Sequence, residues 1–169
     1  MLHLIIKAIP APLHRAVMPY AHKVRHYWRR WRGKPIAGAA IILTNPAGEV
    51  LLLRHSYGPP VWALPGGGIG SGEDPMLAAR RELAEELEIV PTTLTPMGTM
   101  EETISGSHHV GHLFEATTSD TPKPDGREVL EARFFAPDAL PDNVGRISQS
   151  RLEAWAERRG VHATSSSRT

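Results

Sequence analysis

The chain contains no cysteine among its 169 residues. This absence excludes a disulfide scaffold, a cysteine nucleophile and any thiolate-bound zinc or iron–sulfur centre, and it fits a reducing compartment. The sequence also has no apolar run near the roughly 20 residues that cross a bilayer. The opening MLHLII is interrupted by Lys7 and Pro10, which makes it a poor signal-peptide core. We therefore expect a cytoplasmic globular protein.

Acidic residues are missing from the first 48 positions, which contain eight Lys or Arg. The remaining 11 Lys and Arg accompany all 18 Asp and Glu, so the body of the chain has a formal charge near −7 and the leader near +8. Such asymmetry indicates a leader with its own contacts, or one that folds back on an acidic body. Because 41% of residues are hydrophobic and 22% charged, the chain as a whole is not disordered.

The sequence divides into three parts: a basic amphipathic N-terminal extension over 1–34, one domain over 35–160 and a flexible tail over 161–169. A helix over 19–32 in the leader would place an aromatic and aliphatic set on one face: Tyr20, Val24, Tyr27, Trp28 and Trp31. That face would suit packing on the body or on a second subunit in a homodimer. Contact of residues 13–34 with a membrane surface or with RNA is equally open.

The domain alternates strand-like and helical patterns. Five strands are expected, over 36–44, 49–55, 94–103, 109–117 and 128–135, the first two as a hairpin around the turn NPAG. One helix should run from Pro75 to about Leu87 with Asp74 as its cap, and a second over 147–159 should end at Gly160. The five glycines between 66 and 72, and the stretch 118–126, are expected to form loops. These elements predict an α/β or α+β layered domain.

Three glutamates share one face of the first predicted helix. Glu82 and Glu86 are four residues apart and Glu82 and Glu85 three apart, a spacing that costs like-charge repulsion. A hard cation such as Mg²⁺ or Mn²⁺ would remove that repulsion. The glycine-rich stretch before the helix allows close backbone approach to a ligand, and the helix N-terminus favours anions. Metal ions beside an anion site indicate phosphate chemistry, although a helix face with acids is by itself most often solvated surface.

The segment GGIGSGEDPMLAARRELAEELEI resembles the signature box of the Nudix hydrolases. Its specified positions are Gly67, Glu73, the pair Arg81 and Glu82, the pair Glu85 and Glu86, with aliphatic Leu83 and Ile89. The upstream WALPGG is similar to the family's usual lead-in. The box departs from the family at Glu88, where the pattern has a glycine after the helix. A left-handed backbone at that point would cost a non-glycine residue about 1 kcal/mol or shift the helix end.

The resemblance implies an α/β/α sandwich with a mixed sheet, and an enzyme: a Nudix-type, metal-dependent pyrophosphohydrolase. Its substrate would be a nucleoside diphosphate derivative or a nucleoside triphosphate. Mg²⁺ or Mn²⁺ would be held by the following groups: the Gly66 carbonyl, Glu82, Glu85, Glu86 and, from beyond the box, Glu128, with Glu131 as its alternative. Glu82 is the first choice for general base, and Glu86 completes the catalytic pair. Arg81 would pair with Glu73.

Substrate contacts are expected from Gly67 and, at the end of the second strand, from Arg54 and Tyr57. Trp62 is expected in the core or in the cleft wall. The cluster His108, His109 and His112 could bind metal or phosphate, but ordinary histidines at a strand edge are favoured. An alternative function is a non-catalytic nucleotide-sensing module that uses the basic leader as its contact arm. The intact acidic set argues against that alternative.

Overall fold

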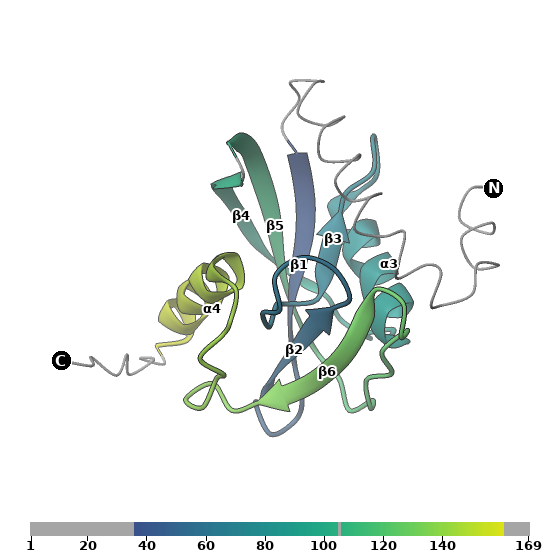
Figure 1. Cartoon of the computed structure of the whole chain (residues 1–169), viewed down its shortest axis with the longest axis vertical. Helices are drawn as coiled ribbons and strands as arrows, with labels where there is room; N and C mark the ends of the chain where they lie inside the picture. Colours follow the sequence, from purple (N-terminus) through teal and green to yellow (C-terminus); the bar gives the residue numbers. More distant parts are fainter. Residues whose placement is uncertain (1–35, 105, 161–169) are drawn as a thin grey trace.

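A computed structural model describes residues 36–104 and 106–160 of the chain. The predicted leader helix over 19–32 and the predicted tail over 161–169 lie outside these residues. The described part contains one six-stranded sheet in the order β4-β5-β1-β2-β6, with β3 paired to β1 off this path (Figure 1). The strands are β1 (Ile36–Thr44), β2 (Val50–His55), β3 (Gly66–Gly68), β4 (Thr95–Ile104), β5 (Ser107–Thr117) and β6 (Val129–Phe135).

The sheet is mixed, because β1 runs parallel to β5 and antiparallel to β2 and β3. The expected hairpin of β1 and β2 is present only beside its turn, where Thr44 pairs with Val50. Beyond that pair, β2 turns away and pairs along its length with β6. The side of β1 that β2 leaves is taken by β3. The two strands of the hairpin thus open apart, and the glycine-rich segment enters between them.

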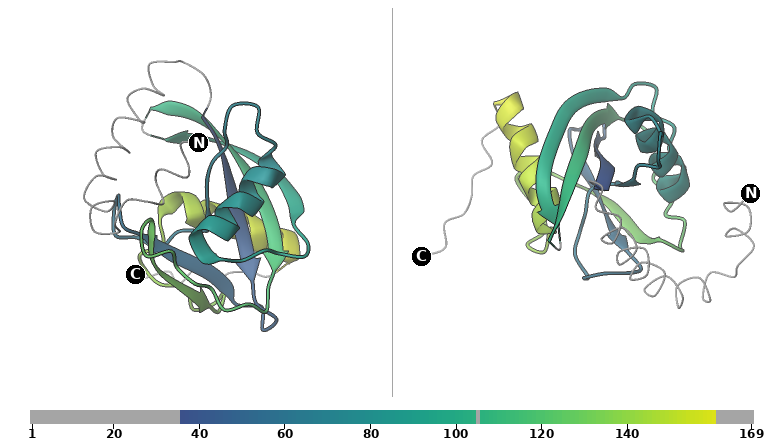
Figure 2. Two further views of the ribbon diagram at one scale, coloured as in Figure 1. Left: turned by 90° about the vertical axis from the view of Figure 1, so that its right-hand side faces the viewer. Right: turned by 90° about the horizontal axis from the view of Figure 1, so that it is seen from above.

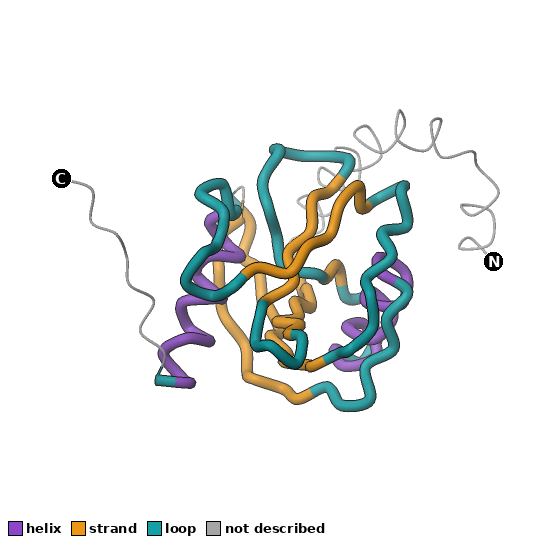
Figure 3. The backbone as a smooth tube through the Cα atoms, turned by 90° about the horizontal axis from the view of Figure 1, so that it is seen from below, coloured by secondary structure: helices purple, strands orange, loops and turns teal. Residues whose placement is uncertain are grey.

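Two helices cover opposite faces of the sheet, α3 (Pro75–Leu87) and α4 (Arg146–Arg159) (Figures 2 and 3). Side chains alternate along β1, as the pleat of a strand requires. Ile41 and Leu43 pack in the core under α3, whereas Ile42 packs with Trp155 of α4. This arrangement is the α/β/α sandwich that the resemblance implied. Among the described residues, no helix combines the length and apolar character needed to span a bilayer.

Helix α3 begins and ends where the sequence predicts. The Asp74 carboxylate accepts the N–H groups of Met76 and Leu77 at 2.9 and 3.1 Å, and Pro75 occupies the first turn. At the other end Glu88 adopts a left-handed conformation with φ of +56°. The glutamate therefore takes up the backbone geometry that the family gives to glycine, and the helix end is not shifted.

The structure of the glycine-rich segment differs from the sequence-based expectation. It was expected to form a loop, but Gly66–Gly68 forms strand β3, paired with Gly38–Ala40 of β1. Gly66 has φ of +142°, and a Cβ atom placed there would lie 2.1 Å from the Ala39 carbonyl oxygen. Only glycine permits this approach, so these residues form a strand by their lack of side chains rather than by β-propensity.

Candidate active site

Two carboxylates of α3 lie directly against β3. The Glu86 side chain accepts the Gly66 N–H at 3.1 Å, and only 5% of the residue is exposed. The Glu82 carboxylate fills the space beside Gly67, where an added Cβ would lie 2.4 Å from its Oε1 atom. The glycine strand is therefore what lets the acidic face of the helix approach the sheet so closely.

Burial sets the protonation of these two carboxylates. It raises the pKa of Glu86 well above its ordinary value; the neighbouring Glu82 charge adds to that rise, the Gly66 N–H opposes it, and Glu128 and Asp125 contribute further repulsion. Burial also raises the pKa of Glu82, against the opposing effect of Arg81 and with added repulsion from Glu85 and Glu128. Negative charge is thus concentrated at a poorly solvated place, where a cation would stabilise it strongly.

Arg81 joins the loop before the helix to the acidic face. Its Nε donates to Glu73 at 2.9 Å, and its Nη1 donates to Glu82 at 2.8 Å. A longer contact of 3.4 Å reaches Glu85, and Nη2 donates to the Gly68 carbonyl at 3.1 Å. The bond from Arg81 is the largest cause of the lowered pKa of Glu73, which also accepts the Gly70 N–H. Arg81 therefore clamps β3 and its loop to α3, and it competes with any cation for Glu82 and Glu85.

A loop before β6 brings further acids toward this place. The Asp125 carboxylate accepts the N–H groups of Glu128 at 3.0 Å and Val129 at 2.8 Å, and the Asp125 N–H donates to the Glu86 carbonyl at 3.1 Å. This turn fixes the backbone of Glu128 close enough for its charge to act on Glu82 and Glu86. Sequence reasoning did not identify Asp125, although its Asp-Gly dipeptide is a turn signal.

The other predicted substrate residues lie at the end of β2. Arg54 pairs with Glu131 at 3.4 Å, and its Cζ lies 5.9 Å from the centroid of the Trp62 ring. Tyr57 stacks on His55 with ring centroids 5.1 Å apart. Trp62 is 8% exposed and belongs to the core on the α4 side. Glu131 thus pairs with Arg54, whereas the charge of Glu128 acts on Glu82 and Glu86.

The three predicted histidines, His108, His109 and His112, all lie in β5. His108 is exposed and faces Glu101 at 3.3 Å, whereas His109 lines a pocket beside Gly38. Within residues 36–104 and 106–160, no group of three or more His, Cys, Asp or Glu side chains is arranged to hold a metal ion as the side chains stand. On the acidic face, Glu82 and Glu85 are in contact with Arg81.

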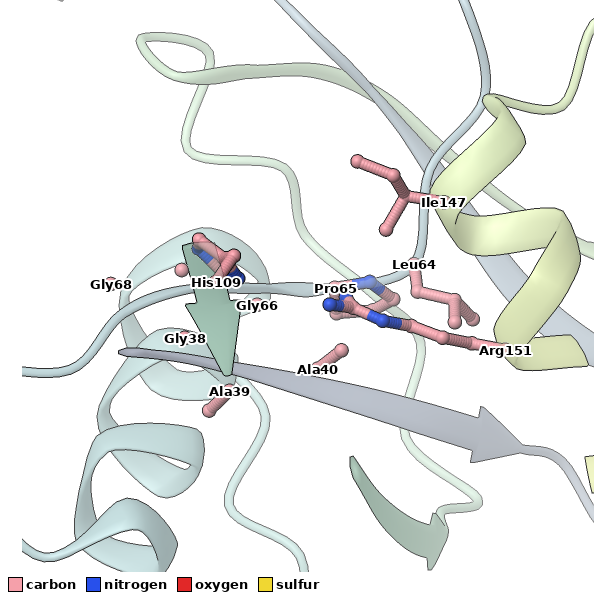
Figure 4. A pocket seen from close by; sticks show the side chains of 11 residues that line it. Gly38, Ala39, Ala40, Leu64, Pro65, Gly66, Gly68, His109, Ile147 and Arg151 are labelled. Atoms are coloured by element: carbon pink, nitrogen blue, oxygen red, sulfur yellow. The ribbon is translucent and has the colours of Figure 1, made fainter. Parts of the chain in front are cut away.

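A pocket of about 230 Å³ lies on the α4 side of β3 (Figure 4). Backbone of β1 and β3 forms one wall, with Leu64 and Pro65 preceding β3. Ile147 and Arg151 of α4 and His109 of β5 supply the other side chains. Gly67 lines this pocket, whereas Arg54 and Tyr57 do not.

The mixed sheet between two helices, with a glycine strand against an acidic helix face, defines the class of this protein. The chain belongs to the Nudix hydrolase family: the NUDIX domain matches residues 34–156.

Individual relatives agree with this assignment. The chain is 46% identical over 50 residues to an RNA pyrophosphohydrolase from Rhodospirillum rubrum, a match that covers 30% of each protein. It is 32% identical over 127 residues to an isopentenyl-diphosphate Δ-isomerase from Streptomyces griseus, covering 69% of this chain and 63% of the relative. A crystal structure of a MutT NUDIX hydrolase from Burkholderia pseudomallei superposes with a TM-score of 0.65 at 26% identity, covering 71% of this chain and 97% of that one.

Proposed function

We propose that the protein is a metal-dependent pyrophosphohydrolase that cleaves the diphosphate linkage of a nucleoside diphosphate derivative or a nucleoside triphosphate. The observation that carries the proposal is the placement of the buried Glu86 and the half-buried Glu82 against a strand without side chains. Membership of the Nudix family and the likeness to RNA pyrophosphohydrolases support it.

The residues fit a hard divalent cation, Mg²⁺ or Mn²⁺. Glu82 and Glu86 offer carboxylate oxygens, and their mutual repulsion is what a cation would relieve. We assign Glu85, Glu128 and the Gly66 carbonyl to the same ligand set. When bound, the ion supplies orientation of the attacking water and neutralisation of charge on the phosphoryl oxygens.

The side chains themselves supply the proton chemistry and its geometry. Glu82 is assigned as the general base, because burial raises its pKa and makes its carboxylate a better proton acceptor. Arg81 fixes the Glu82 carboxylate through Nη1, while Glu73 fixes Arg81. Arg81 and Glu73 are therefore positioning residues whose loss would loosen the loop between β3 and α3.

The test is phosphate release from a panel of nucleoside triphosphates and nucleoside diphosphate derivatives, with Mg²⁺ or Mn²⁺ present. Glu82→Gln should reduce turnover about 100-fold or more, because it removes the base. Glu86→Gln should lose most turnover and keep the fold. Glu153→Gln, an exposed change on α4 that faces Gln149, is the matched control and should have no effect. Undiminished hydrolysis by Glu86→Gln would refute the assignment.

The same panel decides the alternative, a nucleotide-sensing module without turnover. Wild-type protein that binds a nucleotide in equilibrium dialysis yet releases no phosphate with either ion would favour sensing. The similarity to an isopentenyl-diphosphate Δ-isomerase adds a third reaction to be checked on the wild type, rearrangement of an isoprenoid diphosphate without phosphate release.

A further inference from the structure

The segment before β6 is tied to the C-terminal end of α3. The Lys123 N–H donates to the Leu87 carbonyl at 2.9 Å, and the Asp125 N–H donates to the Glu86 carbonyl at 3.1 Å. Carbonyl groups in the last turn of a helix have no partner within the helix, so these two bonds complete the end of α3. Figure 1 shows β6 beginning beside this helix. The segment 123–128 therefore has a fixed place relative to the carboxylates of α3.

Two separate segments hold the backbone of Glu128. Its N–H donates to the Asp125 carboxylate at 3.0 Å, and its carbonyl accepts the Ser56 N–H at 2.8 Å. The Ser56 hydroxyl also donates to the Arg127 carbonyl at 2.6 Å. Ser56 is the first residue after β2, so the end of that strand and the Asp125 turn hold Glu128 from two sides.

An irregularity at the start of β6 turns its first residues relative to the rest of the strand. The pairing with β2 passes from Glu131 to Val129 and leaves out Leu130, which is 48% exposed. Val129 and Ala132 both pack in the cluster under α3 although they are three residues apart, which the regular alternation of a strand does not allow. Bulges of this kind change the direction of side chains beside functional sites. The residues that precede β6 therefore have a direction of their own, and their contacts fix it.

The Asp125 carboxylate is occupied by backbone donors. Its Oδ1 atom accepts the N–H groups of Arg127, Glu128 and Val129 at 3.0, 3.0 and 2.8 Å. An aspartate that bonds to the backbone just after it stabilises a turn. The charge of Asp125 has a cost, because it adds to the repulsion that raises the pKa of Glu86. The contribution of this side chain is therefore the shape of the turn.

We propose that Asp125 and Ser56 are positioning residues that hold the Glu128 carboxylate toward the acidic face of α3. The inference rests on the proposed hydrolysis and on the place of Glu128 in its ligand set. Glu128 repels both Glu82 and Glu86. A carboxylate that repels its neighbours stays near them only if its backbone is held, and partners that hold a metal ligand in this way increase the affinity for the ion.

The test measures Mn²⁺ binding by the full-length protein without substrate, from the electron paramagnetic resonance signal of the free ion. Asp125→Ala should raise the dissociation constant about tenfold, as expected for the loss of a group that orients a metal ligand. Asp125→Asn keeps an acceptor oxygen for the turn and should stay within about twofold of the wild type. Asp120→Ala, which removes an exposed aspartate from the same loop, is the matched control and should have no effect.

A double-mutant cycle shows whether Asp125 acts through Glu128. Glu128→Gln alone should weaken Mn²⁺ binding, and the addition of Asp125→Ala should weaken it no further, because the positioned carboxylate is already gone. Multiplication of the two effects would overturn the inference. Equal weakening by Asp125→Ala and Asp125→Asn would also overturn it, since the effect would then belong to the charge and not to the turn.

Ser56 provides a second variant in case Asp125→Ala fails to fold. Ser56→Ala removes the hydroxyl bond to the Arg127 carbonyl and keeps the backbone bond to Glu128, so it should weaken Mn²⁺ binding by only about threefold. Ser56→Thr keeps the hydroxyl and should restore the affinity. Ser119→Ala, an exposed serine of the loop before β6, is its control. Unchanged binding in Ser56→Ala would reject the role of Ser56.

Phosphate release by the same variants separates this inference from the proposed activity. If Glu128→Gln leaves Mn²⁺ binding unchanged, Glu128 is not a ligand and the inference fails, while the hydrolysis assigned to Glu82 and Glu86 still stands. If Mn²⁺ binding depends on Asp125 as predicted but no nucleotide is hydrolysed, the positioning role stands and the proposed activity fails.

Discussion

At the scale of single residues, Glu86 shows how burial makes the charged form of a carboxylate unfavourable. Its carboxylate is buried beside Glu82, and the charges of Glu128 and Asp125 repel it further. The N–H of Gly66 gives partial compensation. In a protein of marginal stability, a buried charge of this kind is retained at a cost to folding.

This burial predicts a pH dependence of stability in metal-free protein. Since the pKa of Glu86 is raised in the folded state, its full contribution to stability is present below the ordinary value of 4.5 and is lost as pH rises through the folded-state pKa. Glu86→Gln should abolish this pH-dependent loss of unfolding free energy. The loss amounts to about 1.4 kcal/mol for each unit by which the pKa is raised. Urea unfolding between pH 4 and 8 in EDTA should therefore show a shallower decline for the variant.

The control for this measurement is Glu153→Gln, whose side chain is exposed on α4. Its curve should run parallel to that of the wild type. If the curve of Glu86→Gln also runs parallel to that of the wild type, the pKa of Glu86 is not raised as the structure indicates.

Sequence spacing predicted the residues of the acidic face but not all of its neighbours. The contact of Arg81 with Glu73 follows from a local segment of loop and helix, which is why the box resemblance could imply it. Other contacts join residues that are 39 or more positions apart in the chain. Examples are the hydrogen bond from the Asp125 N–H to the Glu86 carbonyl and the bond from Arg151 to Glu102. No periodicity within a segment reports such contacts.

At the scale of secondary-structure elements, α3 has a well-capped start and a strained end. Asp74 satisfies two N–H groups of the first turn, while Glu88 occupies a left-handed conformation that glycine adopts more easily. The ion pair of Glu88 with Lys123 is largely exposed, so it compensates little. The position is thus a local departure from the residue best suited to its backbone.

Glu88→Gly is expected to raise the free energy of unfolding by about 0.5–1 kcal/mol, because relief of backbone strain exceeds the added freedom of the unfolded chain. Thermal unfolding of the metal-free protein measures the gain. Glu88→Ala keeps the strain and removes the same ion pair, so it should give no gain. Equal behaviour of the two variants would show that the left-handed conformation costs nothing here.

The strand pattern was predictable because apolar residues alternate or run continuously in β1, β2, β5 and β6, and the observed ends lie within a few residues of the expected ones. Strand β3 was not predictable from the sequence, since glycine is depleted in strands and a glycine-rich composition favours a loop. Its pairing depends on the approach of Gly66 to Ala39, a contact between distant segments.

At the scale of the whole molecule, the two core clusters lie entirely within the described domain. Their residues extend from Ala39 to Ala156, one cluster under α3 and the other under α4. Residues 36–160 thus have a hydrophobic core on both faces of the sheet.

Deletion of residues 1–33 should leave a cooperatively unfolding domain, with the far-ultraviolet circular dichroism of the strands and helices retained. We expect the deletion to abolish any binding of the full chain to anionic liposomes or RNA, because it removes seven of the eight leading basic residues. Loss of cooperative unfolding, or a changed mass in size-exclusion chromatography, would instead indicate that the leader packs on the body or joins two subunits.

The glycine strand β3 lies between the acidic face of α3 and the pocket beside α4. Substitutions on α4 can reshape the pocket while the carboxylates of α3 keep their positions, since each helix faces its own side of this strand. A side chain added at Gly66 or Gly67 would clash with β1 or with Glu82 of α3. Changes in the shape of the pocket should thus accumulate on the C-terminal helix, with the glycines of β3 held unchanged.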